Sequence, residues 1–141
     1  MDKSLSISPI SDADWRSRLT PEQYRINRQG GTECAFTQEL LNEKRPGTYY
    51  DVTGEQPLFR SEDKFESGTG WPSFRKPITP DAVVERVEAS SGYPRTEVLS
   101  RRHGHHLGHV FPDGPGPNGL RYCINAEALK FVPDKEDPGQ P

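Results

Sequence analysis

The segment HLGHVFPDGPGPNGLRYCIN, residues 106–125, combines two short runs of apolar and aromatic residues with a linker between them. The runs HLGHVF and RYCIN have the length and composition of short β-strands. The linker PDGPGPNG consists entirely of residues that are favoured in turns. We therefore predict a wide antiparallel hairpin that brings HLGHVF alongside RYCIN.

Further short runs rich in β-branched and aromatic residues surround this hairpin, and turn-forming residues bound them. They are TYYDV (48–52), PLFR (57–60), AVVERVEA (82–89), TEVLSR (96–101) and the long run LRYCINAEALKFVP (120–133). The chain from Thr48 onward is therefore expected to form an antiparallel β domain.

Helix signals are confined to the N-terminal part of the chain. SDADWRSRL (11–19) opens with a serine that can cap a helix. TPEQYRINRQGG (20–31) has Thr20 and Gln23 at capping-box spacing and two glycines at its end. FTQELLNEKRPG (36–47) offers one more short helix. The expected fold class is mainly β, with short N-terminal helices.

Composition narrows the class of protein. A chain of 141 residues fits one domain, which we expect to span residues 1–141 with a disordered tail over 134–141. The net charge of -3 comes from interspersed charges, so we expect no nucleic-acid partner. The first residues lack the apolar run of a secretory signal, and no run reaches membrane-spanning length. We expect a cytoplasmic monomer that does not bind membranes.

Cys123 lies within the second strand of the expected hairpin. Because side chains alternate along a strand, Arg121, Cys123 and Asn125 share one face, while Tyr122 and Ile124 share the other. A cysteine can be a small buried hydrophobe. It can also be a nucleophile, and a guanidinium and an amide beside it would stabilise the thiolate against its usual pKa of about 8.5. The alternation leaves both interpretations open.

All four histidines, His103, His105, His106 and His109, fall in the segment HGHHLGH. They could form a solvated loop, a metal site, or an acid–base group that serves a neighbouring nucleophile. The predicted hairpin favours the last, because it returns the chain so that His106 or His109 can reach Cys123. Strict alternation places these two histidines on opposite faces, so both can serve one site only if the strand bends or bulges near Gly108.

The loop ESGTGWPSFRKPI (66–78) surrounds Trp71 with glycines and prolines. An indole in such a loop is most often part of the core. It can also form one wall of an apolar pocket or pack against sulfur.

Four segments together resemble the signature of the B-type methionine sulfoxide reductases, and the resemblance extends from about Arg18 to Pro133. They are GTECAF (31–36), SGTGWPSF (67–74), HLGHVFPDGP (106–115) and LRYCIN (120–125). This resemblance implies two antiparallel sheets with short N-terminal helices. It also implies an enzyme that reduces the R epimer of methionine sulfoxide in peptides and proteins.

The resemblance implies roles for individual residues. Cys123 would attack the sulfoxide sulfur, and Arg121 would favour its ionisation. His106 and His109 would position and protonate the sulfoxide oxygen, and Asn125 would orient the group.

Three further residues would support this site by the same resemblance. Trp71 and Phe111 would line the substrate pocket, with the Trp71 indole facing the terminal methyl group. Asp113 would act from behind the site by holding the histidine segment.

The resemblance further implies that a second thiol condenses with the Cys123 sulfenic acid. Many relatives carry this resolving cysteine in the WPSF loop, where this chain has Thr69. Other members use the GTE-AF region, so Cys34 would be the resolving cysteine, carried in from an N-terminal arm. Thioredoxin would then reduce the Cys34–Cys123 disulfide.

Many relatives also hold a structural zinc with two CxxC pairs. The corresponding positions here are Asp51, Gly54, Ser100 and His103. Zinc sites favour thiolates and imidazoles, so we predict a zinc-free protein without any other cofactor. Asp51 is expected to be a surface carboxylate.

One rival interpretation starts from the histidines alone. His103, His105 and His109 could hold a divalent cation in a small cupin-like β-barrel. If the reductase interpretation holds, His103 and His105 are instead expected to be exposed loop residues, and Trp15 anchors its helix.

Overall fold

The computed structural model describes residues 11–34, 39–88, 95–115 and 118–134. Residues 135–141 of the tail expected to be disordered and the start of the third expected helix lie outside these residues. Asp134, the first residue of that tail, is described, and its carboxylate pairs with Arg60 at 2.9 Å. Among the described residues, no helix has the length and apolar character needed to cross a membrane.

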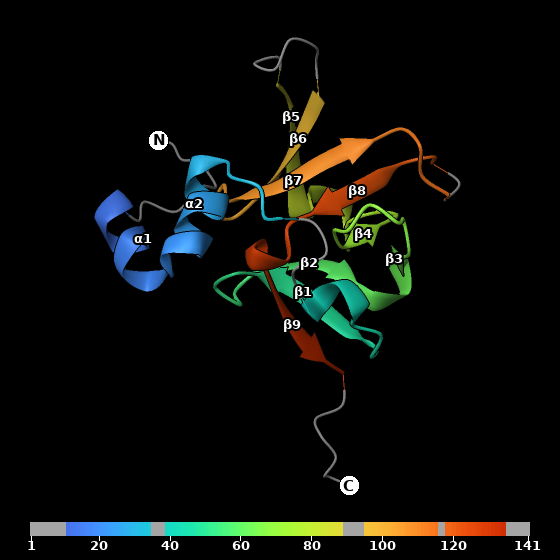
Figure 1. Cartoon of the computed structure of the whole chain (residues 1–141), viewed down its shortest axis with the longest axis horizontal. Helices are drawn as coiled ribbons and strands as arrows, with labels where there is room; N and C mark the ends of the chain where they lie inside the picture. The colour runs from blue at the N-terminus through green and yellow to red at the C-terminus, as the bar shows by residue number, and fades with distance from the viewer. Residues whose placement is uncertain (1–10, 35–38, 89–94, 116–117, 135–141) are drawn as a thin grey trace, which may run out of the picture.

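Two antiparallel sheets make up most of the fold, as the resemblance implies (Figure 1). The smaller sheet has the order β2-β1-β9, from strands β1 (Gly47–Asp51), β2 (Pro57–Arg60) and β9 (Leu129–Pro133). The larger has the order β3-β4-β8-β7-β6-β5, from strands β3 (Lys64–Phe65), β4 (Ser73–Phe74), β5 (Val83–Glu88), β6 (Arg95–Ser100), β7 (His106–Phe111) and β8 (Arg121–Ile124). The central hairpin is β7–β8, as predicted.

Two short helices precede the sheets, and both begin as predicted. Helix α1 (Asp12–Arg18) is capped by the Ser11 hydroxyl. Helix α2 (Pro21–Gln29) has the capping box between Thr20 and Gln23 and ends at Gly30 in the left-handed region. In the described part of the third expected helix, Glu39–Asn42 form a 3-10 turn, η1.

The long run 120–133 was predicted as one stretch, but the structure divides it. Strand β8 ends at Ile124, the 3-10 turn η4 (Ala126–Ala128) follows, and β9 continues in the other sheet. Strands β3 and β4 contain two residues each, which is too short for a sequence pattern to reveal. The remaining 3-10 turns are η2 (Ser61–Asp63) and η3 (Pro80–Ala82).

The main apolar core draws on both sheets. Phe59 of the smaller sheet stacks on Phe74 of the larger one, with ring centroids 4.4 Å apart. Tyr122 and Ile124 from β8 are buried in the same core. Their burial directs the alternate residue, Cys123, to the opposite face of β8.

Candidate active site

The pairing of β7 with β8 places His109 directly opposite Cys123. Gly108 pairs with Ile124 in the same register. A Cβ atom at this position would lie 2.1 Å from the Cys123 carbonyl oxygen and 3.0 Å from the Cα of Ile124. Only glycine therefore allows β7 to pair with β8 in this register.

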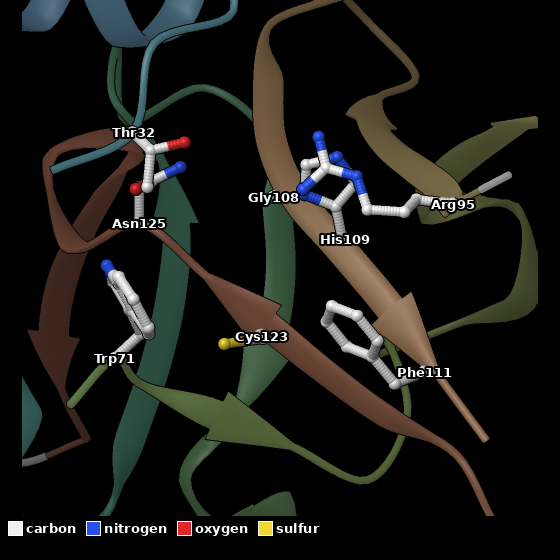
Figure 2. A pocket seen from close by; sticks show the side chains of 8 residues that line it. All are labelled: Thr32, Trp71, Arg95, Gly108, His109, Phe111, Cys123 and Asn125. Carbon is white, nitrogen blue, oxygen red and sulfur yellow. The ribbon is translucent and has the colours of Figure 1, made fainter. Parts of the chain in front are cut away.

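A small pocket of about 150 Å³ opens over this strand pair. Its lining residues are Thr32, Trp71, Arg95, Gly108, His109, Phe111, Cys123 and Asn125. Figure 2 shows the Cys123 sulfur projecting toward the space between Trp71 and Phe111, with Asn125 at the upper edge. Besides Gly108, the pocket thus brings together five of the predicted site residues, and it adds Thr32 and Arg95, which the sequence did not indicate.

A β-bulge resolves the conflict between the two histidines. The pairing of β6 with β7 shifts register between Val98 and Leu99, so that His106 pairs with Leu99 while Gly108 pairs with Val98. The extra residue turns His106 toward His109, and their ring centroids lie 5.5 Å apart. His109 lines the pocket, whereas His106 is not among its lining residues and lies against His109.

The two imidazoles have different surroundings. His109 is half-buried in the pocket wall, whereas His106 is buried and its Nδ1 lies 2.6 Å from Oε2 of Glu97. A carboxylate only accepts hydrogen bonds, so this contact assigns a proton to Nδ1 and orients the ring. Glu97 in turn accepts from Arg86 at 2.7 Å. The sequence interpretation did not assign this orienting role to Glu97.

Burial dominates the electrostatics of Cys123. It raises the pKa of the thiol, while hydrogen bonds from Thr69 and Ser73 and the charge of Arg121 lower the pKa and only partly offset this effect. The Thr69 hydroxyl lies 3.8 Å from the sulfur. The expected stabilisation of the thiolate by Arg121 is therefore present, but it is smaller than the cost of desolvation.

Arg121 is held in place by two neighbours. Asp113 accepts hydrogen bonds from both Nε (2.8 Å) and Nη2 (3.2 Å) of its guanidinium, which also lies 4.4 Å from the centre of the Phe111 ring. Asp113 was expected to hold the histidine segment. The structure gives it a contact to Arg121 instead, because the linker that contains Asp113 leads directly into β8 at Arg121.

Asn125 and Trp71 share a neighbour that the sequence interpretation missed. The backbone N–H of Glu33 donates to Oδ1 of Asn125, and its carbonyl oxygen accepts from Nε1 of Trp71, both at 3.0 Å. Cys34 is the next residue and is exposed. The N-terminal segment is therefore docked against the pocket, although Cys34 and Cys123 are far apart in the sequence.

The four positions that correspond to zinc ligands in relatives are occupied by groups with other partners. The Asp51 carboxylate accepts from the Thr53 hydroxyl and from two backbone N–H groups. The Ser100 hydroxyl accepts from the His105 backbone, and His103 pairs with Glu55 at 2.7 Å. With glycine at the remaining position and no thiolate, this set does not fit a tetrahedral zinc ion.

Three expectations about solvent exposure are wrong. Asp51, His103 and His105 were expected to be exposed, but all three are buried. Trp15 packs edge-on against both histidine rings, at 5.1 and 4.8 Å between centroids. Trp15 thus anchors α1, as expected, but it does so by covering these histidines.

The same packing counts against a histidine metal site. His103 and His105 lie around Trp15, whereas His109 lines the pocket with Cys123. Within the described part of the chain, no group of three or more His, Cys, Asp or Glu residues could hold a metal ion. The cupin-like alternative is therefore not favoured.

A half-buried thiol that faces an imidazole, an amide and an indole across a small pocket is the arrangement of a cysteine-dependent enzyme. Comparison with known proteins shows to which family of such enzymes the chain belongs. Residues 19–133 match the SelR domain.

Named relatives align with most of the chain. The chain is 54% identical over 125 residues to the peptide methionine sulfoxide reductase MsrB of Thiobacillus denitrificans, spanning 89% of this chain and 95% of the relative. It is 47% identical over 134 residues to the human mitochondrial methionine-R-sulfoxide reductase B2, spanning 90% and 74%. The chain belongs to the MsrB family of methionine sulfoxide reductases.

Proposed function

We propose that this MsrB-family enzyme reduces methionine-R-sulfoxide in peptides and proteins by a two-thiol cycle that starts at Cys123. Family membership supports the reaction. The observation that carries the residue assignment is the pocket in which Cys123 lies opposite His109, with Trp71, Phe111 and Asn125 in the wall.

In the first half of the cycle, the Cys123 thiolate attacks the sulfoxide sulfur. The sulfoxide oxygen takes a proton from His109, with His106 beside it, and Asn125 orients the group. The attack forms a bond between the two sulfurs and leaves the oxygen as a hydroxyl on the substrate sulfur. That sulfur–sulfur bond and the S–O bond of the substrate then break as the hydroxyl passes to the Cys123 sulfur, so methionine leaves with both of its S–C bonds intact and Cys123 becomes a sulfenic acid. The sulfoxide is reduced by two electrons and Cys123 is oxidised by two.

In the second half, the Cys34 thiolate attacks the Cys123 sulfur. The S–O bond breaks, the oxygen leaves as water with one added proton, and a Cys34–Cys123 disulfide forms. A dithiol reductant of the thioredoxin kind then returns both cysteines to thiols by exchange. The docking of Glu33 against Asn125 and Trp71 supports Cys34 in this role, because it holds the neighbouring residue beside the pocket.

The proposal includes a zinc-free, monomeric enzyme that acts in the cytoplasm as a single domain. The poor match of Asp51, Ser100 and His103 to a zinc site supports the first point. Elemental analysis of the purified protein tests it, and one bound zinc per chain would contradict it.

A single-turnover experiment tests the cycle. Reduced protein is mixed with a peptide that contains methionine-R-sulfoxide, without an external reductant, and methionine and remaining thiols are measured. We expect one methionine and the loss of two thiols in the wild type, one methionine and one thiol lost in C34S, and no reaction in C123S. The S epimer serves as the control substrate. Reduction of neither epimer by the wild type would refute the proposed function.

A further inference from the structure

Glu33 is a buried carboxylate to which the proposed reaction assigns no role. It lies in the segment between α2 and Cys34, and only 2% of its surface is exposed. Its carboxylate oxygens accept from the backbone N–H groups of Ala126 (2.8 Å) and Glu127 (2.9 Å). These two residues follow Asn125 directly, so the side chain of Glu33 ties its segment to the end of β8.

The backbone of Glu33 contacts the pocket from the same position. Its N–H donates to Oδ1 of Asn125, and its carbonyl oxygen accepts from the Trp71 indole N–H. At the other end of the Asn125 amide, Nδ2 donates a hydrogen bond to the Leu107 carbonyl oxygen at 3.0 Å. A single residue therefore holds two walls of the pocket and also precedes the exposed Cys34.

We propose that Glu33 is a positioning residue that clamps the Cys34-bearing segment to the pocket. Its carboxylate fixes the segment, and the fixed backbone orients Asn125 and Trp71 for the sulfoxide and keeps Cys34 within reach of the Cys123 sulfenic acid. This inference rests on the proposed two-thiol cycle and adds a residue to it.

The burial of Glu33 supports this role over a purely local one. Taking a carboxylate out of water is unfavourable, and desolvation raises its pKa, while the two backbone N–H bonds lower it and offset part of this cost. A buried acceptor with two charge-assisted bonds fixes a segment more rigidly than an exposed side chain does. A rigid segment raises the effective concentration of Cys34 at Cys123.

The substitution E33Q tests the clamp with little change in volume. Glutamine replaces one acceptor oxygen by an NH₂ group, which meets a backbone N–H and cannot accept from it. E22Q is the matched control, because Glu22 lies at the start of α2 and forms an exposed ion pair with Arg25. E33D, which keeps the charge on a shorter side chain, is the second variant in case E33Q does not fold.

Rapid-quench kinetics on the full-length protein separate the two half-reactions. We expect E33Q to slow the loss of the second thiol by about tenfold or more. The Cys123 sulfenic acid should then persist between methionine release and disulfide formation, and dimedone should trap it. We expect KM for the sulfoxide peptide to rise several-fold, because Trp71 and Asn125 lose a fixed partner. E22Q should match the wild type in both steps.

A readout that does not depend on activity is the Trp71 indole N–H signal in NMR, which W71F assigns. We expect this proton to exchange with water faster in E33Q than in the wild type and in E22Q. E33Q could lower the Tm and yet leave the indole exchange and both reaction rates unchanged at temperatures well below that Tm. This result would show that Glu33 contributes only to stability, and it would overturn the inference.

The two proposals can fail separately. Failure of the wild type to release methionine refutes the proposed function, whereas a normal wild type with an E33Q protein of equal rates refutes only the clamp. If the wild type loses a single thiol, Cys34 is not the resolving residue, and the clamp is then judged by KM and by indole exchange alone.

Discussion

The Thr69 hydroxyl, in the loop that carries Trp71, lies 3.8 Å from the Cys123 sulfur. Thr69 belongs to a chain of hydroxyl groups, since Ser67 bonds to Thr69 at 2.8 Å and to Ser73 at 2.7 Å. A hydroxyl at this distance can donate to the thiolate, and it lowers the pKa of the buried Cys123. The hydroxyl at position 69 therefore favours the thiolate form of Cys123 in this chain.

Removing this hydroxyl should make Cys123 harder to ionise. In T69V we expect the Cys123 pKa to rise further, and the activation free energy near neutral pH to increase by about 1 kcal/mol, the contribution of one hydrogen bond. The pH dependence of alkylation in a C34S background measures this pKa. T69S keeps the hydroxyl and should behave as the parent, and an unchanged midpoint in T69V would contradict the assignment.

A cysteine at position 69 should be able to replace Cys34. The Thr69–Cys123 contact is close enough for a disulfide after a small movement, and Gly68 (φ 78°) and Gly70 (φ 93°) on either side make the loop adaptable. We expect T69C in a C34S background to lose two thiols per methionine released, whereas C34S alone loses one. If the double variant also loses only one thiol, the loop cannot bring position 69 to Cys123.

Gly108 should tolerate no side chain. In G108A the new Cβ would meet the Cys123 carbonyl at 2.1 Å, and backbone cannot yield as a flexible side chain can. We expect a loss of about 2–4 kcal/mol in the free energy of unfolding and a large fall in activity, because β7 and β8 must separate. Urea denaturation measures the first effect, and a wild-type midpoint would show that the strand pair can adjust.

Burial of His105 should make the protein sensitive to acid. Desolvation, together with the charge of Arg28, lowers the pKa of His105 to about 3. In the unfolded chain His105 takes up a proton as the pH falls through about 6.5, whereas in the folded chain it does so only near pH 3. The contribution of His105 to the free energy of unfolding is therefore fully present above about pH 6.5 and is lost as the pH drops toward about 3. The Asp51 carboxylate lies 3.7 Å from Nε2 of His105 and opposes this shift, so we expect a loss of about 2–4 kcal/mol.

H105N tests this effect, since asparagine is polar but does not titrate. We expect its free energy of unfolding, measured by urea denaturation from pH 7 to pH 4, to depend less on pH than that of the wild type. H109N is the control, because it keeps His105 and should therefore lose stability with falling pH as the wild type does. Equal slopes in the wild type and H105N would mean that His105 is already charged in the fold.

The sequence by itself determined the local features of this protein. The caps of α1 and α2, the β7–β8 hairpin and the alternation around Cys123 follow from turn chemistry and side-chain period, which act over a few residues. The four quoted segments, through their resemblance to a known family, also indicated Cys123, His109, Asn125, Trp71 and Phe111, and the structure brings these residues to one pocket.

Only the tertiary structure decided what depends on neighbours distant in the chain. The bulge that turns His106 toward His109 arises from pairing with β6, and the burial of His103 and His105 arises from Trp15 of α1. Glu33 becomes a clamp because its partners lie almost a hundred residues away in the sequence. Burial and hydrogen-bond partners are properties of the packed chain, and no local pattern of residues encodes them.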